Sequence, residues 1–301
     1  MSEQPYMPLP GKDLTASNGL LVLVATPIGN LADISARALD TLRNANSILC
    51  EDTRVTSKLL RHYGITNTLL TLHDHNEEER LSFLLTELKK GKIFALISDA
   101  GTPVFSDPGY RLVRAALQND IKVTALPGPN AAITALVLSG FPPAPFMFLG
   151  FPPRGEARKS HFVMLKAAEQ TGLKATLSWY ESPRRLVGTL ETLAEVFGPD
   201  REASVGRELT KLYEEVRRGP LSTLISHFKE TDPRGEITLL LAPAAEDDNK
   251  EQDLEPLLLK TLKTHSLKDA VTLIAGSTNL PRKFVYKKAL ALSQKNTTKA
   301  E

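Results

Sequence analysis

Short apolar runs alternate with amphipathic segments over residues 19–141. Each run is rich in Val, Ile and Leu, ends at Gly, Pro, Asp or Asn, and has the length of a strand; the runs are 20–28, 47–52, 68–74, 92–100 and 122–128. Their continuous apolar character is typical of strands in a sheet that is covered on both faces. Segments with helical spacing lie between and after them, near 33–44, 54–63, 77–90, 109–119 and 130–139. This alternation predicts an α/β fold with βαβ units and a parallel sheet.

The pattern changes after residue 141. Helices are predicted at 156–170, 184–197 and 221–229, and strands at 176–182, 203–209, 212–219 and 235–243. The strands have the spacing of hairpins, so we expect a mixed second sheet. The proline-rich segment FPPAPFMFLGFPPR (141–154) is interpreted as a hinge between two domains.

These patterns predict six segments in the chain. They are a disordered tail over 1–18, an N-terminal α/β domain over 19–141, a C-terminal α/β domain over 142–244, an acidic linker over 245–255, a basic helical module over 256–295 and a tail over 296–301. The linker assignment depends on six acids and one lysine with little apolar content, which is typical of a solvated segment.

The single cysteine, the first 18 residues and one uncharged stretch limit the classes of protein to which this sequence can belong. The single cysteine, Cys50, excludes an intramolecular disulfide and a cluster of thiolates, and favours a buried core residue. Residues 1–18 lack the basic start and apolar core of a signal peptide, so we expect a cytoplasmic protein. The uncharged stretch 123–153 is long enough to span a membrane, but its seven prolines make a spanning helix untenable, so no membrane partner is expected.

The net charge of +2, from 37 basic and 35 acidic residues of 301, argues at first against a nucleic-acid partner. The charge is unevenly distributed, however. The last 42 residues hold nine basic and two acidic side chains, a charge of +7, which leaves 28 basic and 33 acidic residues, or −5, in the remainder. The basic segment has the pattern of a helix-turn-helix, with a turn at GSTN and lysines on the face of its last helix opposite Val285. Such a surface can bind RNA phosphates or simply aid solubility.

Polar and glycine-rich segments follow the predicted strands of the first sheet. They are TPIGN (26–30), EDTR (51–54), HDHNE (73–77), SDAGTPVFSDPG (98–109) and PGPNAA (127–132). In an open α/β sheet the ligand binds at the carboxyl ends of the strands, so five such segments predict a site there. For any one of these segments alone, an ordinary strand–helix turn is the favoured interpretation.

Common nucleotide and hydrolase motifs are absent from the sequence. No GxGxxG follows the first strand, and neither GxxxxGK[ST] nor GxSxG occurs. His73 and His75 alternate on one strand and can share a face, but nothing supplies a third ligand. We therefore expect a hydrogen-bonded loop there and no metal.

Several of these motifs occur together in a known family. VATPIGNLADISARAL, EDTR, LHDHNE, SDAGTPVFSDPG, LPGPNAAITAL, YESPRRL, RELTKLYEE and GEITLLL appear in this order, and the resemblance that they carry covers roughly residues 20–293. The sequence closely resembles the ribosomal RNA small subunit methyltransferase I family, within the tetrapyrrole-methylase superfamily. The resemblance implies a two-domain α/β enzyme that binds S-adenosylmethionine (SAM) between its domains. It also implies 2′-O-methylation of a cytidine in 16S rRNA within the small ribosomal subunit, and a homodimer.

The resemblance also implies cofactor-binding positions. Carried onto this sequence, they are Pro27, Ile28, Asp99, Ala100, Gly101, Thr102, Val104, Ala131, Ala132, Tyr180, Leu209 and Ile237. Backbone groups and the Asp99 carboxylate suit the polar ends of SAM, and the apolar side chains suit a cleft wall. The apolar residues Val104, Leu209 and Ile237 would belong to a core whether or not a ligand binds.

The reaction requires the acceptor hydroxyl to lose a proton, which favours a general base. The candidate catalytic residues are Glu51, Asp52, Arg54, Arg207, Glu208 and Lys211, with Asp74 as a further base and Lys211 suitable only if its pKa is depressed. The arginines can hold phosphates or orient the ribose. An alternative is that Glu51, Arg54, Arg207 and Glu208 form interdomain ion pairs. Two other functions stay open: a tetrapyrrole methyltransferase, and an RNA-binding protein without activity.

Overall fold

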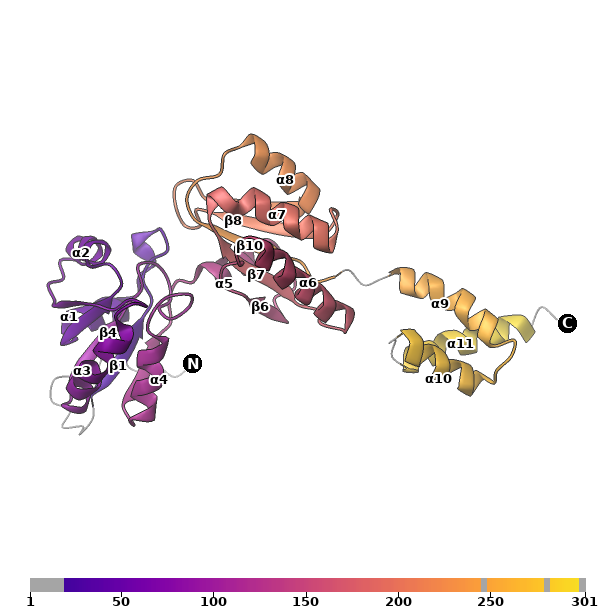
Figure 1. Cartoon of the computed structure of the whole chain (residues 1–301), viewed down its shortest axis with the longest axis horizontal. Coiled ribbons are helices and arrows are strands. Elements are labelled where there is room, and N and C mark those ends of the chain that lie inside the picture. Colours follow the sequence, from indigo (N-terminus) through magenta and orange to yellow (C-terminus); the bar gives the residue numbers. More distant parts are fainter. Residues whose placement is uncertain (1–18, 245–247, 279–281, 298–301) are drawn as a thin grey trace, which may run out of the picture. The chain divides into compact units, whose positions relative to one another are not determined.

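A computed structural model describes residues 19–244, 248–278 and 282–297 (Figure 1). The chain forms two compact units, residues 1–243 and residues 244–301. The predicted tail over 1–18 lies outside the described residues.

The first half of the larger unit contains a five-stranded sheet. Its strands are β1 (Leu20–Val24), β2 (Ser47–Cys50), β3 (Leu69–Thr71), β4 (Ile93–Leu96) and β5 (Lys122–Leu126), in the order β3-β2-β4-β1-β5. Every pair is parallel, which confirms the prediction for this sheet. The central neighbours β1 and β4 are each followed by one of the polar segments, TPIGN and SDAGT.

Helices cover both faces of this sheet, because consecutive strand residues point to opposite sides. On one side Leu20 and Val22 pack in a core with helices α1 (Ala36–Asn44) and α2 (Thr53–His62). On the other side Leu21 packs with helices α3 (Glu77–Lys89) and α4 (Tyr110–Gln118). Strands buried in this way need apolar residues at every position, as the sequence has. A short 3-10 helix, η1 (Leu31–Asp33), precedes α1.

The second half of the larger unit contains a mixed sheet, as predicted. Its strands are β6 (Phe146–Phe148), β7 (Thr176–Glu181), β8 (Glu202–Arg207), β9 (Glu215–Pro220) and β10 (Ile237–Leu241), in the order β6-β7-β10-β8-β9. Only β6 and β7 are parallel; the other pairs are antiparallel. The predicted hinge over 141–154 therefore contains an edge strand, which tolerates the flanking prolines because its outer backbone groups need no partner.

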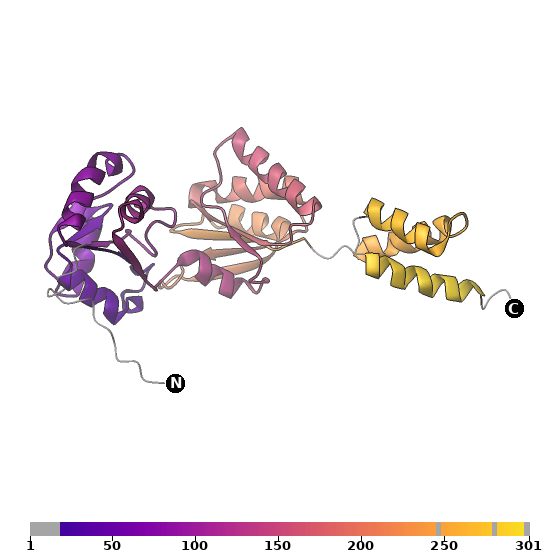
Figure 2. The ribbon, with the colours of Figure 1, turned by 90° about the horizontal axis from the view of Figure 1, so that it is seen from below.

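Helices α6 (Glu156–Gln170), α7 (Pro183–Phe197) and α8 (Leu221–Glu230) lie beside this sheet (Figure 2). They share a core with one of its faces, and this core includes the fully buried Trp179. Helix α5 (Ala131–Ser139) lies on the other face, where its Leu136 packs with Leu240 of β10. The predicted boundary at residue 141 would place α5 with the first sheet. Its sequence AAITALVLS has no charged residue, so the sequence pattern did not show which sheet it would cover.

The smaller unit contains α9 (Asp248–Thr261), α10 (Leu267–Thr278) and α11 (Arg282–Thr297), with a core that includes Leu254, Val271 and Val285. The interpretation of 245–255 as a linker is wrong from Asp248 onward. Leu254 of α9 is buried in the core of the smaller unit, so this part of the predicted linker is folded. The predicted tail 296–301 overlaps the last two residues of α11. No helix in the described ranges has the length and apolarity to cross a membrane.

Candidate active site

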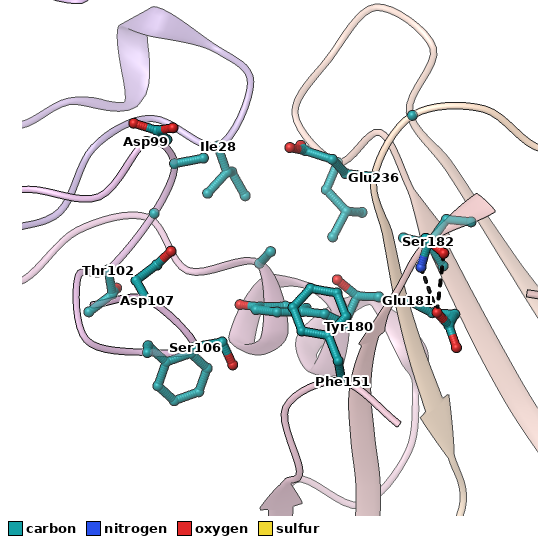
Figure 3. Close-up of a pocket in the computed structure, with 18 of the residues that line it drawn as sticks. Ile28, Asp99, Thr102, Ser106, Asp107, Phe151, Tyr180, Glu181, Ser182 and Glu236 are labelled. Atoms are coloured by element: carbon teal, nitrogen blue, oxygen red, sulfur yellow. Dashed lines mark hydrogen bonds between the residues drawn. The ribbon is translucent and has the colours of Figure 1, made fainter. Parts of the chain in front are cut away.

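A cleft of about 400 Å³ lies between the carboxyl edge of the first sheet and the second sheet (Figure 3). The first half of the larger unit, with the start of α5, contributes Ile28, Asp99, Ala100, Gly101, Thr102, Phe105, Ser106, Asp107 and Ala131. The second half contributes Phe151, Tyr180, Glu181, Ser182, Pro183, Leu209, Gly235, Glu236, Ile237 and Thr238. Its volume is within the range of small-molecule sites.

Backbone hydrogen bonds hold the loop after β4 against the loop after β1. The Thr26 amide donates to the Gly101 carbonyl (2.9 Å), and the Gly101 amide donates to the Thr26 carbonyl (3.1 Å). Gly101 has a φ of +83°, and a Cβ there would lie 3.2 Å from Cγ2 of Ile28. The left-handed backbone therefore favours a glycine at this position, and the close approach to Ile28 leaves little space for a side chain. The Thr102 hydroxyl fixes the same loop from the other side by donating to the Pro129 carbonyl (3.0 Å).

The following residues, 104–107, form a strained turn. Val104 and Ser106 have φ values of +72° and +67°, a region that costs non-glycine residues of order 1–3 kcal/mol each. This turn presents Phe105 and Asp107 to the cleft. The Phe105 ring stacks on Phe148 of β6 with 4.1 Å between centroids, so an aromatic contact connects the strained turn to the second sheet.

The end of β7 forms the opposite wall. Tyr180 lines the cleft, and the carboxylate of the neighbouring Glu181 is fully buried. That carboxylate accepts hydrogen bonds from the Ser182 amide (2.7 Å) and the Thr189 hydroxyl (2.6 Å), and Arg185 lies 3.3 Å away. With these partners Glu181 fixes the turn between β7 and α7.

Four acids line the cleft, Asp99, Asp107, Glu181 and Glu236, and its lining contains no lysine or arginine. Glu181 is paired with Arg185 (3.3 Å) and Glu236 with Lys211 (2.9 Å), so among the described residues the uncompensated negative charge of the cleft comes from Asp99 and Asp107. Burial, reinforced by the nearby carboxylate of Glu51, raises the pKa of Asp107 to about 7. Burial also raises the pKa of Asp99. Burial and mutual repulsion make these two carboxyl groups difficult to ionise, and a cationic ligand would offset both effects.

Nine of the twelve predicted cofactor positions line this cleft. They are Ile28, Asp99, Ala100, Gly101, Thr102, Ala131, Tyr180, Leu209 and Ile237. The other three do not line it: Pro27 and Ala132 are buried, and Val104 packs in the core with α3 and α4.

Sequence reasoning missed more than half of the lining. The missed residues are Phe105, Ser106, Asp107, Phe151, Glu181, Ser182, Pro183, Gly235, Glu236 and Thr238. Asp107 lies in the same motif as Asp99, and YESP and GEIT contain most of the remainder, so these motifs carried a usable signal. Phe151 had no signal, since it lies in a segment interpreted only as a hinge.

The six predicted catalytic residues lie outside the lining. Five of them form ion pairs, each within one half of the unit: Arg54 with Asp52 (2.6 Å), Arg207 with Glu215 (3.0 Å), and Lys211 with Glu208 (2.7 Å). These contacts are local, so the structure does not show the interdomain pairs considered as an alternative. Glu51 is exposed, immediately after β2.

The pKa directions distinguish these candidates. Hydrogen bonds from Arg54 lower the pKa of Asp52 to about 2. Burial works to raise the pKa of Glu208, but the Lys211 ammonium and the Glu236 amide lower it below its usual value. Burial similarly opposes ionisation of Lys211, yet its two carboxylate partners raise its pKa, so the depressed pKa required of a lysine base is excluded. Although Glu51 is exposed overall, neighbouring protein atoms remove part of the water around its carboxylate, and this partial desolvation, reinforced by the charge of Asp99, raises its pKa.

The two histidines of HDHNE lie close together, with ring centroids 6.0 Å apart. Within the residues that the structure describes, no three His, Cys, Asp or Glu side chains are grouped so that they could hold a metal ion.

Solved structures with this fold include a diphthine synthase, 17% identical over 74% of this chain and 90% of that chain with a TM-score of 0.58. Another is the uroporphyrin-III-C-methyltransferase of Thermus thermophilus, 20% identical over 75% of this chain and 94% of that chain with a TM-score of 0.50. Identities this low establish the fold alone.

Sequence comparisons show the family of the chain in addition to its fold. Residues 20–225 match the family profile of tetrapyrrole (corrin/porphyrin) methylases, and residues 248–293 match the RsmI C-terminal HTH domain. A Mesorhizobium japonicum protein named ribosomal RNA small subunit methyltransferase I is 43% identical over 90% of this chain and 92% of its own length. A Thermotoga maritima protein of the same name is 46% identical over 74% of this chain and 98% of its own length. The chain therefore belongs to the ribosomal RNA small subunit methyltransferase I family of the tetrapyrrole methylases.

Proposed function

We propose that the protein uses SAM to methylate the ribose 2′-hydroxyl of a cytidine in 16S rRNA of the small ribosomal subunit, in the cytoplasm. The observation that carries this proposal is the acid-lined cleft around Asp107 in a chain whose relatives are named as small-subunit rRNA methyltransferases.

The cleft has the chemistry that SAM requires. When bound, SAM supplies a methyl group on a cationic sulfonium. Asp107 and Asp99 provide negative charge for its cationic groups, and Ile28, Leu209 and Ile237 provide an apolar wall. The backbone at Gly101 has no side chain to obstruct a ligand, and the hydrogen bonds to Thr26 hold it in place.

Methyl transfer to an oxygen requires alignment of the acceptor and removal of its proton. Holding both reactants in register lowers the barrier by several kcal/mol, up to roughly 7–11 in the best model systems. Glu51 is the best-suited base of the six candidates. Its pKa is raised, whereas ion pairs hold the pKa of Asp52 and Glu208 down. It also interacts electrostatically with Asp107 and Asp99 of the cleft. In this proposal Glu51 accepts the 2′-hydroxyl proton during attack.

The smaller unit provides a surface for RNA. On α11 the buried Val285 and Ala289 face the core, while Arg282, Lys283 and Lys287 are exposed. A row of cations of this kind is attracted to phosphates whatever the base sequence.

A homodimer is supported by an apolar surface on α5. Ile133 and Val137 of this helix are 48% and 75% exposed, although the helix has no charged residue. A second copy of the chain packed against this helix would remove both side chains from water.

The test is methyl transfer from radiolabelled SAM to small subunits that lack the modification, to free 16S rRNA and to a uroporphyrinogen-type acceptor. We expect label in the RNA of the subunits, recovered as 2′-O-methylcytidine after nuclease digestion. Label in the tetrapyrrole alone would refute the proposal. Glu51→Gln should lower kcat by about 10²–10⁴-fold without changing the Kd for SAM, and an unchanged kcat would exclude Glu51 as the base.

A further inference from the structure

Helix α2 presents a row of cations along its exposed side. Arg54, Lys58 and Arg61 recur at spacings of four and three residues, which places them on one face, and all three are exposed. The buried residues of the helix, Thr56 and Leu60, lie on the opposite face. No acid occurs between residues 53 and 73, so this stretch carries a charge of +3 with its histidines neutral. Arg54, Lys58 and Arg61 are called the α2 row below.

Most of this row has no compensating acid. Arg54 is paired with Asp52, the residue that caps the helix. Lys58 and Arg61 form no ion pair with any residue that the structure describes. In the second half of the same unit the arginines at 185, 201 and 207 are paired with carboxylates at 3.3 Å or closer. Two unpaired cations are therefore available to an outside anion.

The α2 row begins at the edge of the cleft. Helix α2 follows β2 directly, so it starts at the carboxyl edge of the sheet, where the cleft lies. The amide of Asp52, one residue before the helix, donates a hydrogen bond to Oδ1 of Asp99 (3.3 Å), which lines the cleft. From Arg54 to Arg61 the row then extends along the helix for about 10 Å.

Charge decides which ligand fits this surface. The cleft lining offers the phosphates of a polyanionic substrate no lysine or arginine, and its two acids without a cationic partner among the described residues, Asp99 and Asp107, repel them. A substrate of this kind must be held by cations outside the cleft. Resting on the proposed function, in which the substrate is RNA, we propose that the α2 row binds the phosphate backbone of the RNA strand next to the nucleotide in the cleft.

In this proposal the α2 row positions the RNA strand and takes no part in methyl transfer. Phosphate contacts fix the register and orientation of a nucleic acid and carry no sequence information themselves. Loss of Lys58 and Arg61 should therefore weaken RNA binding in a salt-dependent way and leave SAM binding unchanged.

The experiment compares two variants of the full chain with equal changes of charge. One is Lys58→Ala with Arg61→Ala. The control is Lys89→Ala with Lys90→Ala, at the C-terminal end of α3 and therefore at the opposite edge of the same sheet. Fluorescence anisotropy gives the Kd for a labelled single-stranded RNA over a range of salt concentrations, and calorimetry gives the Kd for SAM.

We expect the α2 variant to bind RNA about tenfold more weakly at 0.1 M salt, with the slope of log K against log salt reduced by about 1.4, as for two lost contacts to a single strand. The control variant should keep the wild-type slope, and Lys58→Arg with Arg61→Lys should keep wild-type affinity. Wild-type RNA affinity in the α2 variant would overturn the proposal, and so would an equal loss in the control.

Two further results separate this proposal from the proposed function. If the α2 variant loses RNA affinity but the wild-type protein transfers no methyl group to RNA, the RNA-binding row is supported and the proposed function fails. If the variant keeps RNA affinity but no longer binds assembled small subunits, the row contacts an acidic protein surface and the proposal is overturned.

Discussion

The backbone amide of Asn30 donates a hydrogen bond to the hydroxyl of Thr210, 3.1 Å away, and joins the loop after β1 to the loop after β8. Beside it Gly29 is so close to the second loop that a Cβ would lie 2.4 Å from Cγ of Lys211 and 2.8 Å from Oγ1 of Thr210. Ile28 directly precedes Gly29 and Leu209 directly precedes Thr210, and both Ile28 and Leu209 line the cleft. The contact therefore helps to set the separation of the two cleft walls.

Replacement of Thr210 by valine should weaken SAM binding. Valine keeps the shape of threonine but cannot accept the hydrogen bond from Asn30, and a net loss of about 1 kcal/mol corresponds to a fivefold rise in Kd. Calorimetric titration with SAM measures this change. Thr210→Ser is the matched control because serine retains the hydroxyl at this left-handed position, where φ is +66°. Equal SAM affinity of the valine variant and the wild type would show that the contact does not shape the cleft.

Asp107→Asn should weaken SAM binding by about tenfold or more, because the amide removes the negative charge that faces a cation. The wild-type affinity should also depend on pH. Burial raises the pKa of Asp107 to about 7, so the carboxyl is neutral below that pH and SAM affinity falls as the pH is lowered through 7. The asparagine variant should lack this step. A wild-type Kd that is constant between pH 6 and pH 8 would contradict the role given to Asp107.

The same substitution should stabilise the protein without ligand at alkaline pH. The pKa of Asp107 is about 7 in the folded chain and near 3.8 in the unfolded chain, so the unfolded state loses its proton first. Stability therefore decreases as the pH rises between these values and stays reduced above pH 7. Asparagine removes this cost, and at pH 8 the free energy of unfolding should rise by about 1–3 kcal/mol, an estimate reduced for solvent screening. Urea denaturation at pH 5 and pH 8 would show whether the gain grows with pH.

The first sheet was predictable because parallel strands covered on both faces have a simple sequence pattern. The runs that contain Leu20–Val24 and Ile93–Leu96 are apolar at nearly every position, and polar motifs follow both. The rule that ligands bind at carboxyl ends of strands then located one wall of the cleft. Residues of the second wall, such as Tyr180 and Ile237, were found through family resemblance, since periodicity alone could not show that they would face Ile28.

What the sequence did not show depends on tertiary contacts. An entirely apolar helix such as α5 has no face that identifies its partner sheet. The stacking of Phe105 on Phe148 joins residues 43 positions apart, in segments with no regular pattern. The raised pKa of Asp107 results from burial and from carboxylates on separate loops, which only the folded chain brings together.

Glu169→Ala should destabilise the larger unit by about 3 kcal/mol or more. The Arg201 side chain is 9% exposed; it is paired with Glu169, and its Nε donates to the Ala242 carbonyl (2.9 Å). Removing the acid leaves a buried guanidinium without its carboxylate, which is more costly than the pair itself is favourable. Glu195→Ala is the control, because Glu195 forms an exposed pair with Lys159 and should change stability by less than about 1 kcal/mol. Similar urea midpoints for the two variants would show that the buried pair contributes no more to the free energy of unfolding than the exposed pair.

Truncation after Pro243 should separate cofactor binding from substrate binding. Every residue of the cleft belongs to the larger unit, and the smaller unit has its own core around Leu258 and Val285, so neither needs the other to complete a core. We expect the truncated chain to bind SAM within about twofold of the full chain. The KM for small subunits should rise about tenfold, because the cations of the smaller unit no longer bind phosphates and release counterions from the RNA. Labelled-SAM kinetics at two salt concentrations measure both quantities. An unchanged KM would assign RNA binding to the larger unit alone, and a lost SAM site would show that the two units depend on each other.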